Sequence, residues 1–218
     1  MSEHMALENL TVLDLTRVLA GPFCTMMLAD MGANVIKIEV PKGGDDTRSY
    51  PPFRAKNLNG ERESVYFANI NRNKKGITLN LKAPEGKEIF KELVKKADIV
   101  VENYRPGVMD KLGLGYDVLK EINPRIIYAA VSGFGCYGPY HLRPGYDILA
   151  QAMGGMMSIT GSKGGEPTRA GSALGDILGG LHVTIGILAA VNARTITGKG
   201  QRVDVSLMLS LIHISEPT

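Results

Sequence analysis

The sequence predicts an α/β fold with a doubly wound, mostly parallel, Rossmann-like sheet. Short apolar runs typical of buried strands alternate with helical segments over residues 11–132, a pattern that favours parallel strands covered by helices on both faces. With 218 residues, 44% of them hydrophobic, the chain is long enough to bury one sizeable core. Its longest apolar run follows Asp176 and predicts a long buried helix.

The segment 11–39 predicts a βαβ unit. TVLDL at 11–15 is a short buried strand, and Gly21-Pro22 begins a helix that ends before Gly32, because proline suits a first helical turn. NVIKIE at 34–39 is the second strand, and a polar loop rich in Gly, Asp and Pro follows over 41–63.

Strands and helices keep alternating further along the chain. We predict strands at 76–81, 98–102, 126–132 and, after a largely helical stretch, 201–206, with helices at 84–96 and 116–122.

The long helix carries leucine and isoleucine at helical spacing together with several glycines. Each glycine lowers helix propensity by up to about 1 kcal/mol, so we expect close backbone packing around them. The apolar stretch 174–191 is shorter than the roughly 20 residues that a membrane span needs. We therefore expect a core helix and no membrane partner.

Composition excludes several classes of protein. The net charge of +3 arises from 25 basic and 22 acidic residues and gives no global field of the nucleic-acid-binding kind. Cys24 and Cys136 lie far apart without a metal-ligand pattern, and no leader peptide opens the chain. These features predict a reduced, cytoplasmic protein without a metal site or a nucleic-acid partner.

Asp176 is the strongest catalytic candidate. It ends the stretch GSALGD and stands at the start of the long helix, where unpaired backbone N–H groups favour an ionised carboxylate. A fixed, ionised carboxylate can act as a nucleophile. An acidic residue is also common as a simple helix cap, so this position alone leaves both interpretations open.

A nucleotide site is suggested by basic residues near the predicted strand ends, although a solvated basic face is the alternative for each of them. These residues are Arg17, Arg72, Lys74, Lys75 and Arg105. Glu39 could bind a ribose, but LTRVLAG at 15–21 lacks G-x-G-x-x-G and disfavours an NAD-linked oxidoreductase.

Two loop motifs carry aromatic and guanidinium groups. In NYRPG, Tyr104 and Arg105 could stack on and clamp a nucleotide, although a plain Pro-Gly turn has the same appearance. In RPGYD, Tyr146 could donate a phenolic hydrogen bond near a reacting carboxylate.

Taken in order, the motifs resemble the class III CoA-transferases, of the formyl-CoA:oxalate and carnitine CoA-transferase type. The likeness covers about 7–208 and rests on LDLTRVLAGP, ADMGANVIKIE, GDDTR, NRNKKGITLNLK, VENYRPG, PGYD, GSALGD and TGKGQRVDVSL. It implies transfer of CoA from an acyl-CoA to a free carboxylic acid through aspartyl anhydride and thioester intermediates. Asp176 matches the nucleophile, and CoA is a substrate, so no metal or permanently bound cofactor is needed.

The resemblance also assigns the residues that contact CoA. Leu79 and Lys82 bound the segment beside the adenosine, Asn103, Tyr104 and Arg105 lie near the diphosphate, and Val40 and Leu19 replace a basic and a polar residue of some members. The full set of contacts is Arg17, Leu19, Ala20, Val40, Leu79, Lys82, Asn103, Tyr104, Arg105, Lys111 and Arg143.

Two other functions stay open. The α-methylacyl-CoA racemases share the fold and use a GHD histidine as a base where this chain has Gly145-Tyr146-Asp147. A free tyrosine, with a pKa of about 10, is a poor base near neutrality compared with histidine at about 6.5, so transferase is favoured. A non-catalytic nucleotide-binding fragment is the second alternative.

The resemblance finally implies a longer protein, with a second small domain, a returning C-terminal segment and an interlocked homodimer. We therefore expect residues 1–208 to be the N-terminal part of the large CoA-binding domain and to be poorly active alone. Residues 209–218 resemble a translated sequencing adapter, and 212–218 show no periodicity or cap, so we expect a non-native tail.

Overall fold

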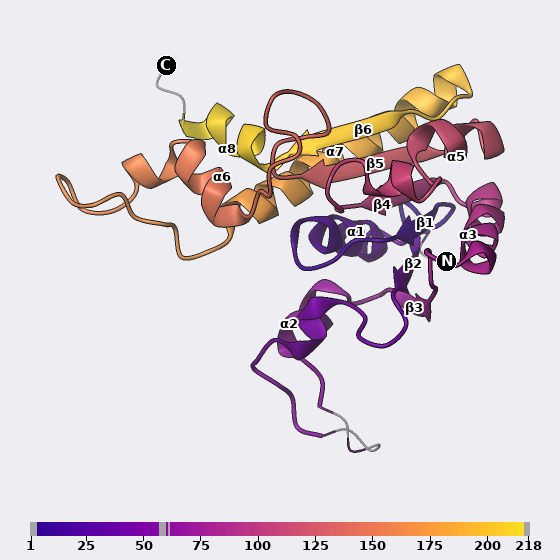
Figure 1. Ribbon diagram of the computed structural model, residues 1–218, viewed down its shortest axis with the longest axis horizontal. Coiled ribbons are helices and arrows are strands. Elements are labelled where there is room, and N and C mark those ends of the chain that lie inside the picture. The colour runs from indigo at the N-terminus through magenta and orange to yellow at the C-terminus, as the bar shows by residue number, and fades with distance from the viewer. Residues whose placement is uncertain (1–3, 57–59, 61, 216–218) are drawn as a thin grey trace.

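A parallel sheet lies at the centre of the molecule (Figure 1). The computed structural model describes residues 4–56, 60 and 62–215, and within them six strands follow the order β3-β2-β1-β4-β5-β6, all paired in parallel. The strands are β1 (Thr11–Asp14), β2 (Asn34–Glu39), β3 (Lys75–Thr78), β4 (Ile99–Glu102), β5 (Ile127–Ser132) and β6 (Arg202–Ser206). The order reverses between β1 and β4, and ligands of doubly wound folds bind outside the carboxyl ends of the strands at such a point. The predicted fold class is confirmed.

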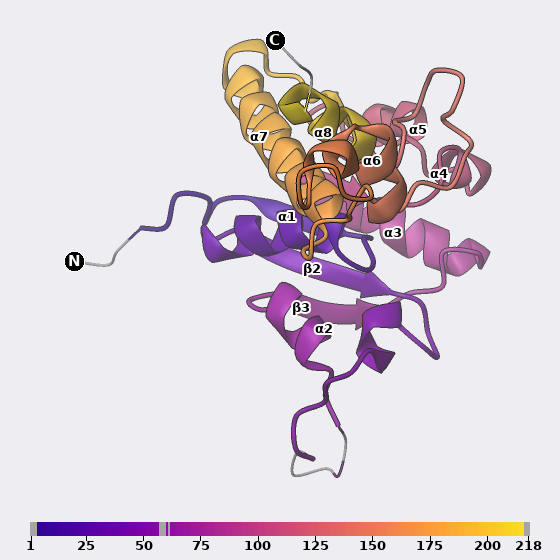
Figure 2. The ribbon, with the colours of Figure 1, turned by 90° about the vertical axis from the view of Figure 1, so that its left-hand side faces the viewer.

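Helices cover both faces of this sheet (Figure 2). Successive strand residues point to opposite faces: Val12 joins an apolar cluster with α1 and α7, while Leu13 joins a second cluster with α3 and α5. The helices are α1 (Ala20–Asp30), α2 (Val65–Ile70), α3 (Pro84–Lys96), α4 (Val108–Lys111), α5 (Tyr116–Ile122), α6 (Asp147–Met153), α7 (Leu174–Thr197) and α8 (Leu207–Ser215), with the 3-10 turns η1 (Asp46–Ser49) and η2 (Met156–Ile159).

Most predicted elements have the expected bounds, and two local differences have clear causes. The strand predicted at 76–81 ends at Thr78, because the Asn80 side chain accepts the Lys82 N–H at 3.1 Å and turns the chain. Helix α2 was not predicted, although Ser64 caps it by accepting the Phe67 N–H at 3.2 Å.

The glycines of α7 permit close packing, as expected. A methyl group on Gly180 would lie 2.7 Å from the Ala20 carbonyl oxygen of α1, and one on Gly186 would lie 2.7 Å from a methyl carbon of Val203 in β6. Larger side chains at these positions would push α1 and β6 away from α7, which explains why residues of low helix propensity stand there.

The length and burial of α7 differ from the prediction. The helix continues past 191 to Thr197, so by length and composition it is long enough to cross a membrane, and the expectation of a shorter segment is wrong. It packs one face on α1 and the sheet, while Ile185 is 63% and Ile196 82% exposed on the other. It is therefore a half-buried core helix.

The chain end is more ordered than the sequence suggests. Helix α8 continues to Ser215, so part of the stretch expected to lack periodicity is helical. Leu211, inside the segment predicted to be non-native, is fully buried in the cluster beneath α7. Residues 216–218 lie outside the described residues.

Candidate active site

A cavity of about 540 Å³ opens at the carboxyl ends of the strands, next to the switch point between β1 and β4. Its wall contains residues that follow β1, β4, β5 and β6, together with the start of α7. Nine of the residues singled out by the sequence line it: Arg17, Leu19, Ala20, Asn103, Tyr104, Arg105, Arg143, Tyr146 and Asp176. Their roles toward a ligand remain predictions, but the structure brings them together.

Four predicted contact residues lie outside this lining. Val40 follows β2 and Leu79 follows β3, at the same edge of the sheet but beyond the cavity wall. Lys82 lies two residues before the start of α3. Lys111 ends the short helix α4 and is exposed. A ligand in the cavity would have to extend along the surface to meet them.

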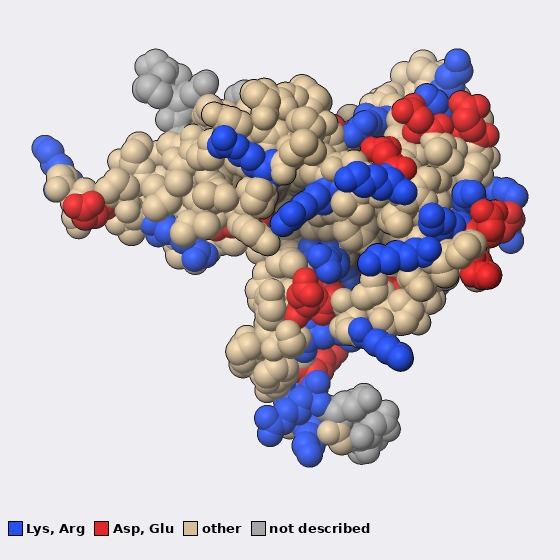
Figure 3. All heavy atoms as spheres, in the orientation of Figure 1, with Lys and Arg blue, Asp and Glu red and all other residues tan. Residues whose placement is uncertain are grey.

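Arginine side chains form part of the cavity wall. Arg17, Arg105 and Arg143 line it, and Figure 3 shows Lys and Arg side chains gathered across the middle of this face beside a hollow. Guanidinium groups bind phosphate oxygens with two parallel hydrogen bonds, so this wall suits an anionic, phosphate-bearing ligand.

Three basic residues expected at this edge lie elsewhere. Arg72 pairs with Asp30 at the end of α1, and Lys75 reaches Asn34 at the start of β2, with 2.7 Å between Nζ and Oδ1. Lys74 is buried against Asp14, with 3.0 Å between Nζ and Oδ2. The prediction was wrong because Arg72 and Lys74 precede β3 and Lys75 begins it, whereas ligands meet the residues that follow a strand.

Asp176 lies in the first turn of α7 and is half-buried. Burial, and to a smaller extent the nearby Asp147 carboxylate, together raise its pKa to about 6. Burial and this like charge act against the helix N-terminus, which favours the ionised form. Near neutrality the carboxylate is still mostly ionised.

Asp147 connects α6 to the start of α7 and was not predicted as a site residue. Its Oδ1 accepts the Gly175 N–H at 2.8 Å, and its Oδ2 accepts from Gln151 Nε2 at 2.9 Å. The Arg169 guanidinium lies 3.6 Å from Oδ2. Asp147 thus fixes the turn that carries Asp176 and also supplies the charge that acts on it.

Asn103 joins the two halves of the sheet at the switch point. Its Oδ1 accepts the Arg17 N–H at 2.8 Å, and its Nδ2 donates to the Arg17 carbonyl at 2.6 Å. The amide of Asn103 is thus engaged by the backbone and positions the cavity wall.

Glu102 is a further buried acid beside the cavity. It accepts the Tyr104 N–H at 2.7 Å and the Tyr128 hydroxyl at 3.1 Å, and burial raises its pKa to about 7. The pKa of Glu102 is therefore close to that of Asp176. Within the described residues, no group of three His, Cys, Asp or Glu side chains is arranged to hold a metal ion.

Sequence reasoning missed other lining residues, among them Asp46, Tyr50, Ser132 and Leu207. Asp46 lies in the quoted GDDTR motif, while Ser132 ends β5 and Leu207 follows β6. The rule that carboxyl ends of parallel strands share one edge could have found the last two.

Comparisons with known proteins agree with this architecture. A family model described as CoA-transferase family III matches residues 7–218. The chain is 52% identical over 209 residues to an acyl-CoA transferase of Fusarium pseudograminearum (strain CS3096), a match covering 94% of this chain and 46% of that protein. It is 48% identical over 219 residues to the succinyl-CoA:mesaconate CoA-transferase of Haloarcula marismortui, covering 98% of this chain and 54% of that protein.

A solved structure agrees as well. The crystal structure of a CAIB/BAIF family protein from Brucella suis superposes with a TM-score of 0.93 at 44% identity, covering 97% of this chain and 56% of that one. This chain spans about half the length of the curated relatives it matches. The family match covers nearly every residue of the chain and includes all residues that line the cavity. The chain therefore belongs to CoA-transferase family III.

Proposed function

We propose that the complete protein transfers CoA from an acyl-CoA thioester to a free carboxylic acid, with Asp176 as the covalent nucleophile. One observation carries the proposal: the half-buried Asp176 lines the same cavity as Arg17, Arg105 and Arg143. A nucleophile and an anion-binding surface in one cavity are what an acyl-CoA substrate requires.

The exchange proceeds in four steps. The Asp176 carboxylate attacks the thioester carbonyl, forming an aspartyl anhydride and releasing CoA thiolate; the thiolate then attacks the aspartyl carbonyl, giving an aspartyl-CoA thioester and the free donor acid. The acceptor carboxylate attacks this thioester and again releases the thiolate. The thiolate finally attacks the acceptor carbonyl of the second anhydride, forming the new acyl-CoA and restoring Asp176.

The cavity supports this chemistry in two ways. Asp176 lies between solvent and the core, so substrate binding in front of it would exclude water from the reactive anhydrides. The arginines would hold the phosphates of CoA, and Tyr146, on the same wall, would donate a hydrogen bond near the reacting carboxylates.

The other two functions have less support. A racemase needs a base where this chain has Tyr146, and the relatives carry transferase names. A pure binding module would not explain a carboxylate on the cavity wall whose pKa is raised toward neutrality.

We also infer a cytoplasmic location and a homodimer for the complete protein. Cys24 and Cys136 are free, which suits a reducing compartment. Ile185 and Ile196 of α7 are exposed apolar side chains, and covering them in a larger assembly would remove apolar surface from water.

Trapping the intermediate tests the proposed function. The complete protein is incubated with succinyl-CoA, acetyl-CoA or formyl-CoA, quenched with hydroxylamine and digested, and the peptide that contains Asp176 is expected to carry a hydroxamate. With succinyl-CoA and acetyl-CoA, which have a carbon α to the thioester, mass spectrometry also follows deuterium entering that carbon from solvent. Deuterium incorporation without the hydroxamate would support the racemase. The absence of both signals would support a binding module.

The activity should fall in acid with a midpoint near the pKa of Asp176. The nucleophile acts as the anion, and burial raises its pKa to about 6, so kcat decreases as the pH falls through this value. Asp147→Asn keeps an oxygen for the Gly175 N–H but removes the charge that raises the pKa, so the acid limb moves to lower pH. The measurement is kcat against pH for both proteins.

Glu102→Gln is the matched control for this shift. It removes another buried carboxylate beside the cavity, with a pKa raised to about 7, but not the charge that acts on Asp176. If the acid limb moved with Glu102→Gln and stayed in place with Asp147→Asn, the assignment of this limb to Asp176 would be wrong.

A further inference from the structure

The turn after β1 contains a backbone conformation that its residue disfavours. Val18 has a φ of 67°, in the left-handed region, where a β-branched side chain is strongly disfavoured. It lines the cavity together with its neighbours Arg17 and Leu19. Such a conformation persists only where surrounding contacts impose it, and it often marks a functional constraint.

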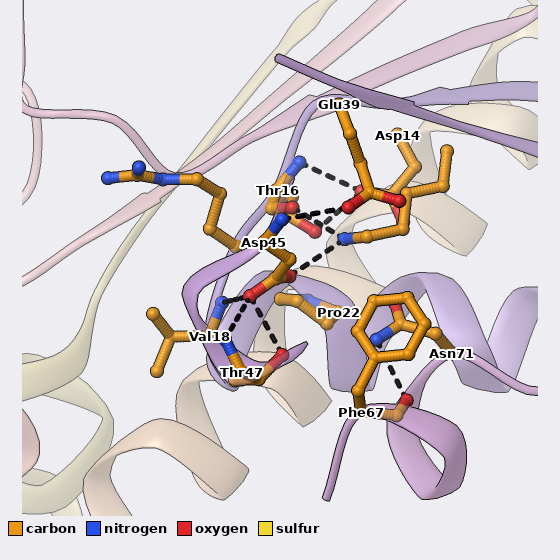
Figure 4. Close-up of polar contacts among 12 residues, drawn as sticks. Asp14, Thr16, Val18, Pro22, Glu39, Asp45, Thr47, Phe67 and Asn71 are labelled. Carbon is orange, nitrogen blue, oxygen red and sulfur yellow. Dashed lines mark hydrogen bonds and ion pairs between the residues drawn. The ribbon is translucent and has the colours of Figure 1, made fainter. Parts of the chain in front are cut away.

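Asp45 supplies the contact to this turn. Its Oδ1 accepts the Val18 N–H at 3.2 Å, and the same oxygen accepts the Thr47 N–H at 3.0 Å and the Thr47 hydroxyl at 2.8 Å. Figure 4 shows these contacts as dashed lines from Asp45 to both residues. The same oxygen thus links the turn after β1 to η1, which contains Thr47.

Lys37 holds the same turn from its other end. Its Nζ lies 2.9 Å from Asp45 Oδ2 and donates to the Thr16 carbonyl at 2.8 Å. One ion pair therefore contacts the backbone on both sides of Arg17. The side chains of Lys37 and Asp45 are 2% and 0% exposed, and neither residue lines the cavity. They reach a bound ligand only through the turn.

A second layer fixes Asp45 itself. Its backbone N–H donates to Glu39 Oε2 at 2.7 Å, and Arg48 binds both carboxylate oxygens of Glu39. Burial raises the pKa of Asp45, but the Lys37 ammonium and the Thr47 hydrogen bonds outweigh this and hold it below its usual value. Asp45 is thus an ionised acceptor held by contacts to several groups.

We infer that Asp45 is a positioning residue of the CoA site: it holds Val18 in the left-handed conformation and thereby fixes Arg17 and Leu19 at the cavity wall. The inference rests on the proposed function. The residue comes from GDDTR, a motif of the sequence to which no role had been given.

Two double variants separate the acceptor from the charge. Lys37→Met with Asp45→Ala removes the ion pair and the acceptor, whereas Lys37→Met with Asp45→Asn removes the ion pair but keeps an oxygen for Val18. In the complete protein, we expect the alanine pair to raise the KM for acyl-CoA by about tenfold with kcat nearly unchanged, because ligand binding is weakened and the chemistry is not. The asparagine pair should keep a KM close to that of the wild type.

Glycine at position 18 supplies the decisive readout. Glycine adopts positive φ without strain, so Val18→Gly added to the alanine pair should restore most of the lost affinity, whereas a merely structural loss would remain. Equal KM values in the alanine and asparagine pairs, or no recovery with Val18→Gly, would overturn the inference. Wild-type protein that transfers no CoA would instead contradict the proposed function.

A conservative variant covers the case in which the alanine pair does not fold. Asp45→Glu keeps the charge beside Lys37 but places the carboxylate one methylene further along the side chain, away from the position that meets Val18. It is expected to raise the KM for acyl-CoA in the same way, and a wild-type KM would count against the inference.

Discussion

Replacing Asp176 by alanine is expected to lower kcat for CoA transfer by a factor on the order of 10⁴ or more, as for other covalent nucleophiles. The substitution removes the oxygen that forms both intermediates, and the remaining cavity can still bind the substrate. The Kd for CoA, measured by calorimetry on the complete protein, should therefore change little. Turnover at the wild-type rate would end the assignment of Asp176 as nucleophile.

Two further substitutions at this position sharpen the result. Asp176→Asn has the same shape but no nucleophilic carboxylate, so it should be as inactive as alanine. Asp176→Glu keeps the carboxylate but displaces it, and because reaction geometry is exacting, it should retain only a small residual rate. If asparagine supported turnover and glutamate did not, shape rather than nucleophilicity would be the property that matters.

Replacing Lys74 by methionine is expected to lower the free energy of unfolding by about 3–5 kcal/mol, the cost of leaving one partner of a buried ion pair alone. The Asp14 side chain is fully buried, and Lys74 Nζ lies 3.0 Å from its Oδ2. Thr16 and Thr25 also donate to Asp14, with Oγ1 to oxygen distances of 2.5 Å and 2.7 Å, but hydroxyl groups carry no compensating charge. Urea denaturation at pH 7 measures the effect.

The pH dependence of this loss gives a check on its cause. Burial raises the pKa of Asp14, but Lys74, Lys37 and the threonine hydroxyls outweigh it and hold the pKa below the usual 3.8. In the wild type, this stabilisation is present above the unfolded pKa and is lost as the pH falls through the folded pKa. Without Lys74 the pKa of Asp14 should rise, so the difference between the two proteins shrinks in acid.

A double variant completes the test. Adding Asp14→Asn to Lys74→Met removes the unpaired charge, and most of the lost stability should return. A double variant less stable than Lys74→Met alone would mean that the hydrogen bonds of the Asp14 carboxylate, rather than its charge, dominate.

The sequence was sufficient for the fold because its signals are local. Strands such as 34–39 and helices such as 84–96 are defined by periodicity, proline and glycine within a few residues, and both have the predicted bounds. The strand-end rule likewise placed Arg17 and Arg105 at one edge of the sheet.

The charged interior could not be predicted in this way. Lys37 occupies a strand position whose burial no alternation pattern reveals, and its partner Asp45 lies in a loop rich in exposed polar residues. Lys74 and Asp14 are 60 residues apart, and Asp147 acts on Asp176 across 29 residues of chain. Pairing between distant segments is set by the assembled fold, not by local sequence.

The topology of the sheet has a consequence for biosynthesis. β5 ends at Ser132, but its outer neighbour β6 begins at Arg202, and α7 is made between them. A ribosome therefore releases β1 to β5 as a sheet whose β5 edge is unpaired and whose α7-facing side is bare until the later segments emerge. The wall that carries Asp176 is completed only after β5 has been made, so a nascent chain arrested before β6 would expose aggregation-prone surface and depend on chaperones.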